Sequence, residues 1–324
     1  MLLSSALAMK QKHLVSLRDY TPADLIEIFD LARRIKADPG AFRDALRGRT
    51  LAMIFQKPST RTRVSFEAGM YQLGGHALNL GANDIQLRRG ETVADTARVL
   101  SRYVDGIMAR VFSHEDLVEM SRYATIPVIN GLSDLSHPVQ ALADFLTLLE
   151  RRGRLQSAKL AYVGDGNNVC HSLMLAAVKL GVSISVATPA GYEPNPLIVK
   201  SAAREAQKLG TPVPVVTRDP MEAVTGAHAV YTDVWTSMGQ EAEAAARVKA
   251  FQGYMVTAAM MAAAGPDAVF MHCLPAHRGE EVSAEVMDGP RSIVFDQAEN
   301  RLHAQKAVLV LLMGGGVDGG PRRA

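Results

Sequence analysis

The chain has 324 residues, of which 48% are hydrophobic and 21% are charged, so it is not intrinsically disordered as a whole. A chain of this length predicts about two compact domains. Its 35 basic and 33 acidic side chains nearly cancel, which argues against broad binding to nucleic acid or to an anionic membrane. A bound anion would therefore need a local site.

Two cysteines, Cys170 and Cys273, stand far apart in the sequence, so they support neither a disulfide framework nor a cysteine-rich zinc module. The apolar N-terminus lacks preceding positive charges and a cleavage pattern, so we read no secretory signal there. The apolar run at 307–313 is shorter than the roughly 20 residues that span a bilayer. We expect a soluble cytoplasmic protein.

Short runs of β-branched residues alternate with helical segments, a pattern typical of βαβ units and a parallel sheet. In the first half, strands are predicted at 51–55, 106–109 and 127–129. The helix after the first strand should place Val64, Ala68 and Tyr71 on one face and end at Gly74-Gly75. Another helix should begin at Pro138, because proline suits a first helical turn.

Charged residues at 150–154 interrupt the apolar pattern, so we predict two domains, 1–150 and 151–324. In the second half, strands are predicted at 159–163, 183–187, 213–216, 229–233, 268–272 and 292–295. A last helix at about 298–313 is long enough to cross back to the first domain. The predicted fold class is α/β.

The segment 59–63, Ser-Thr-Arg-Thr-Arg, stands between a predicted strand and a predicted helix. Free backbone N–H groups and the positive end of the helix dipole meet at such a point. The hydroxyls and the guanidiniums of Arg61 and Arg63 add donors suited to phosphate. Helix capping alone would explain a random sequence of this kind, but two arginines in a first turn oppose the dipole unless an anion binds, so phosphate binding is favoured.

Gly164 and Gly166 follow another predicted strand, as in a dinucleotide-binding turn. Val169 stands where that turn needs a third glycine or alanine, and the next strand ends without an acid for ribose, so a nicotinamide dehydrogenase is disfavoured. Asn167 and Asn168 suit a small polar ligand, and turn formation explains them equally well.

His137 and Gln140 are three residues apart at a helix start, so both can face one ligand. Taken alone, a capping histidine and a surface glutamine are the simpler interpretation. Arg110 ends an apolar strand and is therefore expected to meet something at the carboxyl edge of the sheet.

Asp233 also ends a strand and could hold an ammonium group. The loop after it, with Trp235 and Met238 expected to be partly exposed, could close over substrate. His272, Cys273 and His277 gather at a further strand end. Their spacing is a weak zinc pattern, and a nucleophilic cysteine is possible but not required.

Five segments together resemble the aspartate/ornithine carbamoyltransferase family, in the family's order. They are KPSTRTR at 57–63, HPVQALADFLTL from His137, GDGNN at 164–168, DVWTSMGQE from Asp233 and HCLPAHRGEE from His272. The resemblance runs from about His13 to Met313. It implies two doubly wound parallel-sheet domains with a cleft between them, the first for carbamoyl phosphate and the second for the amino acid.

The implied reaction transfers the carbamoyl group of carbamoyl phosphate to the δ-amine of ornithine, without a metal or organic cofactor. The resemblance implies that carbamoyl phosphate is bound by Ser59, Thr60, Arg61, Thr62, Gln86, Arg110, His137, Gln140, Cys273, Leu274 and Arg301. It implies that ornithine is bound by Asn168, Asp233, Ser237 and Met238. Catalytic roles would fall to Arg61, Arg110, His137 and Cys273.

The resemblance also implies a homotrimer, or a multiple of trimers, in which a loop carrying Gln86 is shared between subunits. Arg88 replaces a glycine often found in that loop, and Val139 replaces a common cysteine. Aspartate, putrescine and an N-acylated ornithine are alternative acceptors. A phosphate-binding regulatory protein without turnover is an alternative of another class.

Overall fold

The computed structural model describes residues 11–81 and 90–314 of the chain. By its internal contacts the chain divides into two compact units. Unit 1 contains residues 11–15, 19–81, 90–133 and 302–314, and unit 2 contains residues 16–18 and 134–301. Among the described residues no helix is both long enough and apolar enough to span a membrane.

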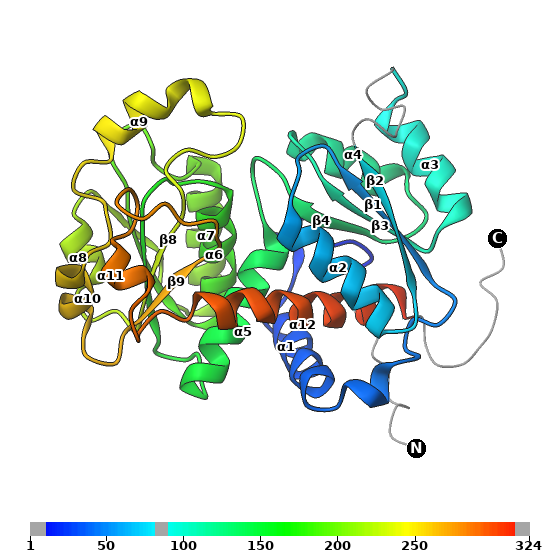
Figure 1. Cartoon of the computed structure of the whole chain (residues 1–324), viewed down its shortest axis with the longest axis horizontal. Helices are drawn as coiled ribbons and strands as arrows, with labels where there is room; N and C mark the ends of the chain where they lie inside the picture. The colour runs from blue at the N-terminus through cyan, green and yellow to red at the C-terminus, as the bar shows by residue number, and fades with distance from the viewer. Residues whose placement is uncertain (1–10, 82–89, 315–324) are drawn as a thin grey trace. The chain divides into compact units, whose positions relative to one another are not determined.

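Unit 1 is built on a four-stranded parallel sheet in the order β2-β1-β3-β4 (Figure 1). The strands are β1 (Thr50–Phe55), β2 (His76–Gly81), β3 (Gly106–Arg110) and β4 (Val128–Leu132). The helices are α1 (Pro22–Ala37), α2 (Thr60–Gln72), α3 (Val93–Tyr103) and α4 (His114–Tyr123), with the short 3-10 turn η2 (Pro39–Phe42). A further 3-10 turn, η1 (Leu17–Asp19), has its first two residues in unit 2 and its last in unit 1.

Apolar residues from the strands of unit 1 pack against α3 and α4. Ile54 of β1 and Ile107 of β3 share one buried cluster with Ala97 of α3 and Leu117 of α4. Helix α2 buries Phe66 and Met70 instead of the predicted face. That prediction was wrong, because Val64 and Tyr71 are exposed, Tyr71 by 83%.

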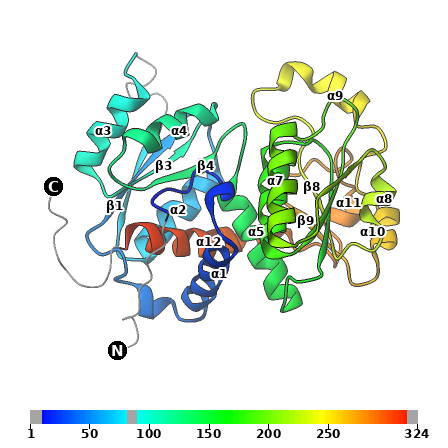
Figure 2. The same cartoon turned by 180° about the vertical axis from the view of Figure 1, so that it is seen from behind.

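Unit 2 is built on a five-stranded parallel sheet in the order β7-β6-β5-β8-β9. Figure 2 labels two of its strands, β8 and β9. The strands are β5 (Lys159–Val163), β6 (Ser183–Ala187), β7 (Val215–Thr217), β8 (Ala229–Thr232) and β9 (Val269–His272). The helices are α5 (Pro138–Arg152), α6 (Asn168–Leu180), α7 (Pro196–Leu209), α8 (Pro220–Val224), α9 (Ala244–Ala250), α10 (Ala258–Ala264) and α11 (Ala284–Met287), with the 3-10 turn η4 (Glu241–Glu243).

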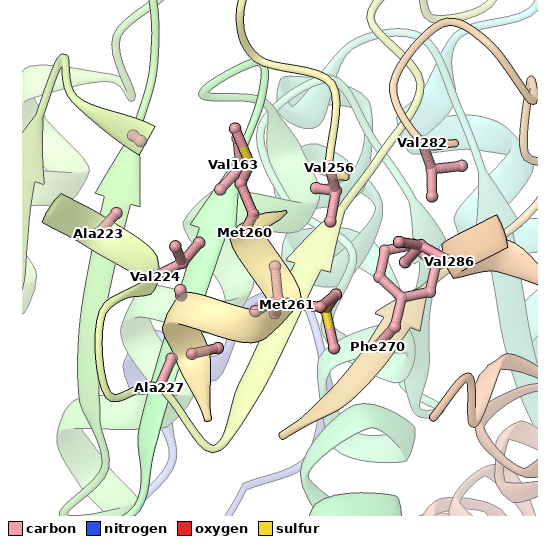
Figure 3. Close-up of a cluster of buried hydrophobic side chains, with 14 of the residues drawn as sticks. Val163, Ala223, Val224, Ala227, Val256, Met260, Met261, Phe270, Val282 and Val286 are labelled. Atoms are coloured by element: carbon pink, nitrogen blue, oxygen red, sulfur yellow. The ribbon is translucent and has the colours of Figure 1, made fainter. Parts of the chain in front are cut away.

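One buried hydrophobic cluster of unit 2 lies between its sheet and the helices α8, α10 and α11 (Figure 3). Val163 of β5 and Phe270 of β9 pack there with Met260 and Met261 of α10. With both sheets fully parallel and flanked by helices, the predicted α/β class is confirmed.

The last helix, α12 (Val294–Met313), contributes residues to both units. The predicted strand at 292–295 is wrong: Ser292 makes only an isolated bridge to Phe270, and Val294 already begins α12. A short buried run of β-branched and apolar residues fits the start of a buried helix as well as a strand.

Candidate active site

The strand order of unit 1 reverses between β1 and β3, and in open α/β sheets ligands bind beyond the carboxyl ends of such strands. Phe55 of β1 pairs with Arg110 of β3, and the Gln56 N–H donates to the Arg110 carbonyl at 2.9 Å. The predicted anion segment at 59–63 begins three residues after Gln56, and Arg110 is buried at the end of the neighbouring strand.

Ser59 caps α2 at this edge. Its Oγ accepts from the Thr62 N–H at 3.2 Å and donates to Thr62 Oγ1 at 3.1 Å. The first turn of α2 contains no acidic residue, while Arg61 is half-buried in it. Arg63 points to the outside and forms an exposed ion pair with Glu67 at 3.4 Å. Of the two predicted guanidiniums, Arg61 is the one placed within the protein.

The strand order of unit 2 reverses between β5 and β8, and Asp233 directly follows β8. Its carboxylate accepts from Asn167 Nδ2 at 2.7 Å, from the Val234 N–H at 2.8 Å and from Cys273 Sγ at 2.9 Å. Three segments that are remote in sequence thus meet around one buried carboxylate.

Asn167 caps helix α6, with its Oδ1 accepting from the N–H groups of Val169 and Cys170. Its amide also contacts Asp233, so it serves both the turn and the candidate site. Asn168, the predicted ligand residue, is half-buried as the first residue of α6, and its carbonyl accepts from Ser172 Oγ at 2.9 Å. The contact of Asn167 with Asp233 had no local sequence signal.

The loop after Asp233 is only partly exposed. Met238 is 44% exposed as predicted, but Trp235 is 5% exposed, so the prediction for Trp235 was wrong. Its indole stacks on Phe251 with centroids 5.4 Å apart. The Ser237 N–H donates to Gln240 Oε1 at 3.1 Å, which orders the loop locally.

A buried ion pair that the sequence did not predict supports this loop. Arg247 Nη1 lies 3.0 Å from Asp165 Oδ2 and donates to the Trp235 carbonyl at 2.9 Å. Burial raises the pKa of Asp165 to about 6, although the Arg247 charge opposes that rise. The end of β5 is therefore tied to the loop that follows β8.

Cys273 and Leu274 directly follow β9, and the imidazole of His272, the last residue of β9, fixes the backbone there. His272 Nδ1 accepts from the Leu274 N–H at 2.8 Å, and His272 Nε2 lies 3.1 Å from the buried carboxylate of Glu281. These contacts hold Leu274 at a φ of 60°, in the left-handed region.

Within residues 11–81 and 90–314, two groups of side chains could offer metal ligands. Asp233, His272 and Cys273 place ligand atoms within 4.8 Å of one another, and so do His277, Glu280 and Glu281. Both ring nitrogens of His272 are already engaged, which leaves two ligands in the first group. A closed zinc site needs about four.

His137 and Gln140 are both buried in unit 2, contrary to the simpler interpretation of the sequence. His137 occupies the N-cap position of α5, but its side chain makes no capping hydrogen bond, and its N–H donates to Ser172 Oγ at 2.8 Å. Gln140 is 1% exposed, so it is no surface residue. Arg301 is also buried in unit 2, whereas Gln86 lies outside the described residues.

Comparison with known proteins gives full-length matches. Residues 12–150 match the family model of the aspartate/ornithine carbamoyltransferase carbamoyl-P binding domain, and residues 156–312 match that of the Asp/Orn binding domain. An ornithine carbamoyltransferase of Thermococcus kodakarensis is 59% identical over 94% of this chain and 97% of its own length.

A relative from Pyrococcus furiosus, named an anabolic ornithine carbamoyltransferase, is 58% identical over 94% of this chain and 97% of its own length. A solved structure of ornithine carbamoyltransferase from Pyrococcus furiosus superimposes with a TM-score of 0.91 at 57% identity, covering 96% of this chain and 99% of that one.

Proposed function

The chain belongs to the aspartate/ornithine carbamoyltransferase family, and we propose that it transfers the carbamoyl group of carbamoyl phosphate to the δ-amine of L-ornithine, forming L-citrulline and phosphate. One observation carries the proposal: two sheet edges offer opposite chemistry. The edge with Arg61 and Arg110 suits a phosphate, and the edge with Asp233 suits an ammonium group.

On the carbamoyl phosphate side, Ser59, Thr60, Arg61, Thr62 and Arg110 hold the phosphate. The free N–H groups at the start of α2 and the guanidiniums supply the donors that phosphate oxygens need. The carbamoyl group is bound by further residues, namely His137, Gln140, Cys273, Leu274 and Arg301. Gln86, from a neighbouring subunit of a homotrimer, completes this site.

On the amino-acid side, Asp233 pairs with the α-ammonium group of ornithine, and Asn168, Ser237 and Met238 contact its α-amino and α-carboxylate groups. The Asp233 carboxylate is held in place by Asn167 and Cys273, which fixes the position of its negative charge. A carboxylate in this position suits a substrate with a free α-ammonium group, which ornithine has and N-acylated ornithine lacks.

The reaction starts from the neutral δ-amine. An alkylammonium of pKa about 10.4 is neutral in roughly one molecule in 2,500 at pH 7, which costs about 4.6 kcal/mol. Desolvation near Leu274 and Cys273 offsets part of that cost, because burial disfavours the charged form. No metal or organic cofactor enters this chemistry.

As the amine attacks, negative charge develops on the carbonyl oxygen and on the leaving phosphate. Arg110, His137 and the Thr62 hydroxyl stabilise the carbonyl oxygen of the tetrahedral intermediate, and Arg61 stabilises the leaving phosphate. The departing phosphate accepts the proton that the amine loses. Because the Pyrococcus furiosus relative is named anabolic, we assign the direction of citrulline synthesis, in arginine metabolism. We also propose a cytoplasmic location, because two cysteines far apart in the sequence suit a reducing compartment.

The test is citrulline formation from carbamoyl phosphate with ornithine, beside aspartate, putrescine and N-acetylornithine at equal concentration. Turnover with ornithine alone is expected. Turnover with another acceptor would reassign the substrate. Absence of turnover with all four, in protein shown to be folded by circular dichroism, would favour a phosphate-binding regulatory protein.

A further inference from the structure

A buried carboxylate stands one helical turn after Gln140. Asp144 is 2% exposed in α5 and receives hydrogen bonds from three side chains. Its Oδ1 accepts from Gln140 Nε2 at 2.8 Å and from Gln297 Nε2 at 2.7 Å, and its Oδ2 accepts from the Tyr231 hydroxyl at 3.2 Å. Nothing in the reaction described above uses Asp144.

The orientation of the Gln297 amide is set from its other end. Its Oε1 accepts from the backbone N–H of His272 at 2.9 Å, and a backbone N–H can only donate. The Nε2 of Gln297 must therefore face Asp144, which makes Oδ1 an acceptor. This argument does not depend on how amide oxygen and nitrogen are assigned at Gln140 itself.

Because Oδ1 of Asp144 is an acceptor, it fixes the orientation of the Gln140 amide. Only Nε2 of Gln140 can donate to Oδ1, so Oε1 of Gln140 points away from Asp144. Gln140 is 1% exposed, and Oε1 accepts no hydrogen bond from the described residues. A buried acceptor without a hydrogen bond is costly, so Gln140 Oε1 suits a ligand that supplies an N–H donor.

We propose that Asp144 is a positioning residue that holds the Gln140 carbonyl toward the NH2 of the carbamoyl group and so selects carbamoyl phosphate over acyl phosphates. This inference rests on the proposed function, since it takes the ligand of Gln140 to be the carbamoyl group. Acetyl phosphate is the matched competitor: a methyl group replaces the NH2, and the phosphate is unchanged. Sites that pair with a substrate N–H discriminate strongly against analogues that lack it.

The test compares the dissociation constants of carbamoyl phosphate and acetyl phosphate by titration calorimetry in wild type and in Asp144→Ala. Alanine removes the acceptor that fixes the Gln140 amide, so the amide can take the reversed orientation. We expect carbamoyl phosphate binding to weaken about tenfold and acetyl phosphate binding to change less than about twofold. Steady-state kinetics should show a raised KM for carbamoyl phosphate with the KM for ornithine unchanged.

The matched control is Thr147→Val, three residues further along α5. It removes another buried hydrogen bond, from Asn300 Nδ2 at 2.9 Å, and should lower thermal stability without changing the ratio of the two affinities. Equal weakening of the binding of both ligands in Asp144→Ala would overturn the proposal, because that pattern means general damage to the site. An unchanged ratio with unchanged affinities would also overturn it.

A double variant guards against a merely structural effect. Asp144→Ala combined with Gln140→Glu gives residue 140 a carboxylate whose two oxygens both accept, so residue 140 presents an acceptor without help from Asp144. We expect it to recover at least part of the lost preference, and no recovery would contradict the proposal. Binding is measured without turnover, so a wild type that forms no citrulline would refute the proposed function while the affinity ratio still judges Asp144.

Discussion

The two sheet edges differ in how their sites are assembled. In unit 1 the hydroxyl and guanidinium donors follow one another from Ser59 to Thr62 at the start of α2, and Arg110 ends β3, the strand that pairs with β1. In unit 2, Asp233 gathers Asn167 and Cys273, which are 66 and 40 residues away in sequence. A local site can be read from consecutive residues, whereas a distributed site depends on strand order.

The two edges also differ in charge. The first turn of α2 carries arginine and no acid, so its dipole and its side chains both favour an anion. The other edge holds the buried carboxylates of Asp165 and Asp233. Variants that affect only one substrate therefore test whether the two edges have separate tasks.

The largest effect is expected from Arg61→Ala. Removing the guanidinium that we propose stabilises the leaving phosphate should lower kcat by about 10²–10³-fold and weaken carbamoyl phosphate binding. The matched control is Arg63→Ala, because Arg63 lies two residues on in the same helix and pairs outward with Glu67. Steady-state kinetics measure both variants. Equal losses in the two would refute the assignment of Arg61.

Asp233→Asn should mainly affect ornithine. Loss of a charge-assisted contact worth about 1.5–3 kcal/mol should raise the KM for ornithine by roughly 10- to 150-fold. The KM for carbamoyl phosphate should stay within about threefold of wild type. Asp288→Asn, at an exposed carboxylate paired with Arg278, is the control. If Asp233→Asn instead raised the KM for carbamoyl phosphate and left the KM for ornithine unchanged, our assignment of the two edges would be reversed.

The buried carboxylate of Asp165 should make stability depend on pH. Burial raises its pKa to about 6, above the unfolded value of about 3.9, so its stabilising contribution is complete below about pH 4 and is lost as pH rises through 6. The difference in slope between wild type and Asp165→Asn should reach at most about 1.4 kcal/mol per pH unit. Urea unfolding at pH 4.5, 5.5 and 6.5 measures it. Parallel profiles would contradict this prediction.

The smallest effect is expected from a pair of cap variants. Ser59→Ala and Asn167→Ala each remove a helix N-cap worth about 1 kcal/mol, so both should lower the melting temperature by about 2–4 °C. Their kinetic effects should differ. Ser59→Ala should raise the KM for carbamoyl phosphate, and Asn167→Ala should raise the KM for ornithine. Identical kinetic effects would remove the distinction between the two edges.

Sequence patterns predicted the fold best where strands carry buried apolar residues. The strands 159–163 and 183–187 have the predicted bounds. Strand β2 was not predicted, because its residues are mostly half-buried or exposed and include His76 and Asn79. The α2 face was wrong because helical spacing of Val64 and Tyr71 does not reveal which face finds a partner.

For the candidate site, the sequence predicted those features that depend on residues close together in the chain. The Ser59–Thr62 arrangement followed from the position of a helix start, and Arg110 from a strand end. The bonds from Asn167 to Asp233 and from Gln297 to Asp144 join residues 66 and 153 positions apart. No local pattern encodes such pairs, because they arise only once strands and helices are in register.

Helix α12 has a consequence for biosynthesis. Gln297 and Asn300 bond within unit 2, whereas Lys306 is buried in unit 1 and donates to Gln72 Oε1 at 2.9 Å. Unit 1 thus contains both the earliest described residues and the last ones. A ribosome that has released residues 11–133 has not yet supplied 302–314, so unit 1 completes its core after unit 2 has been synthesised, against the usual N-terminal-first order.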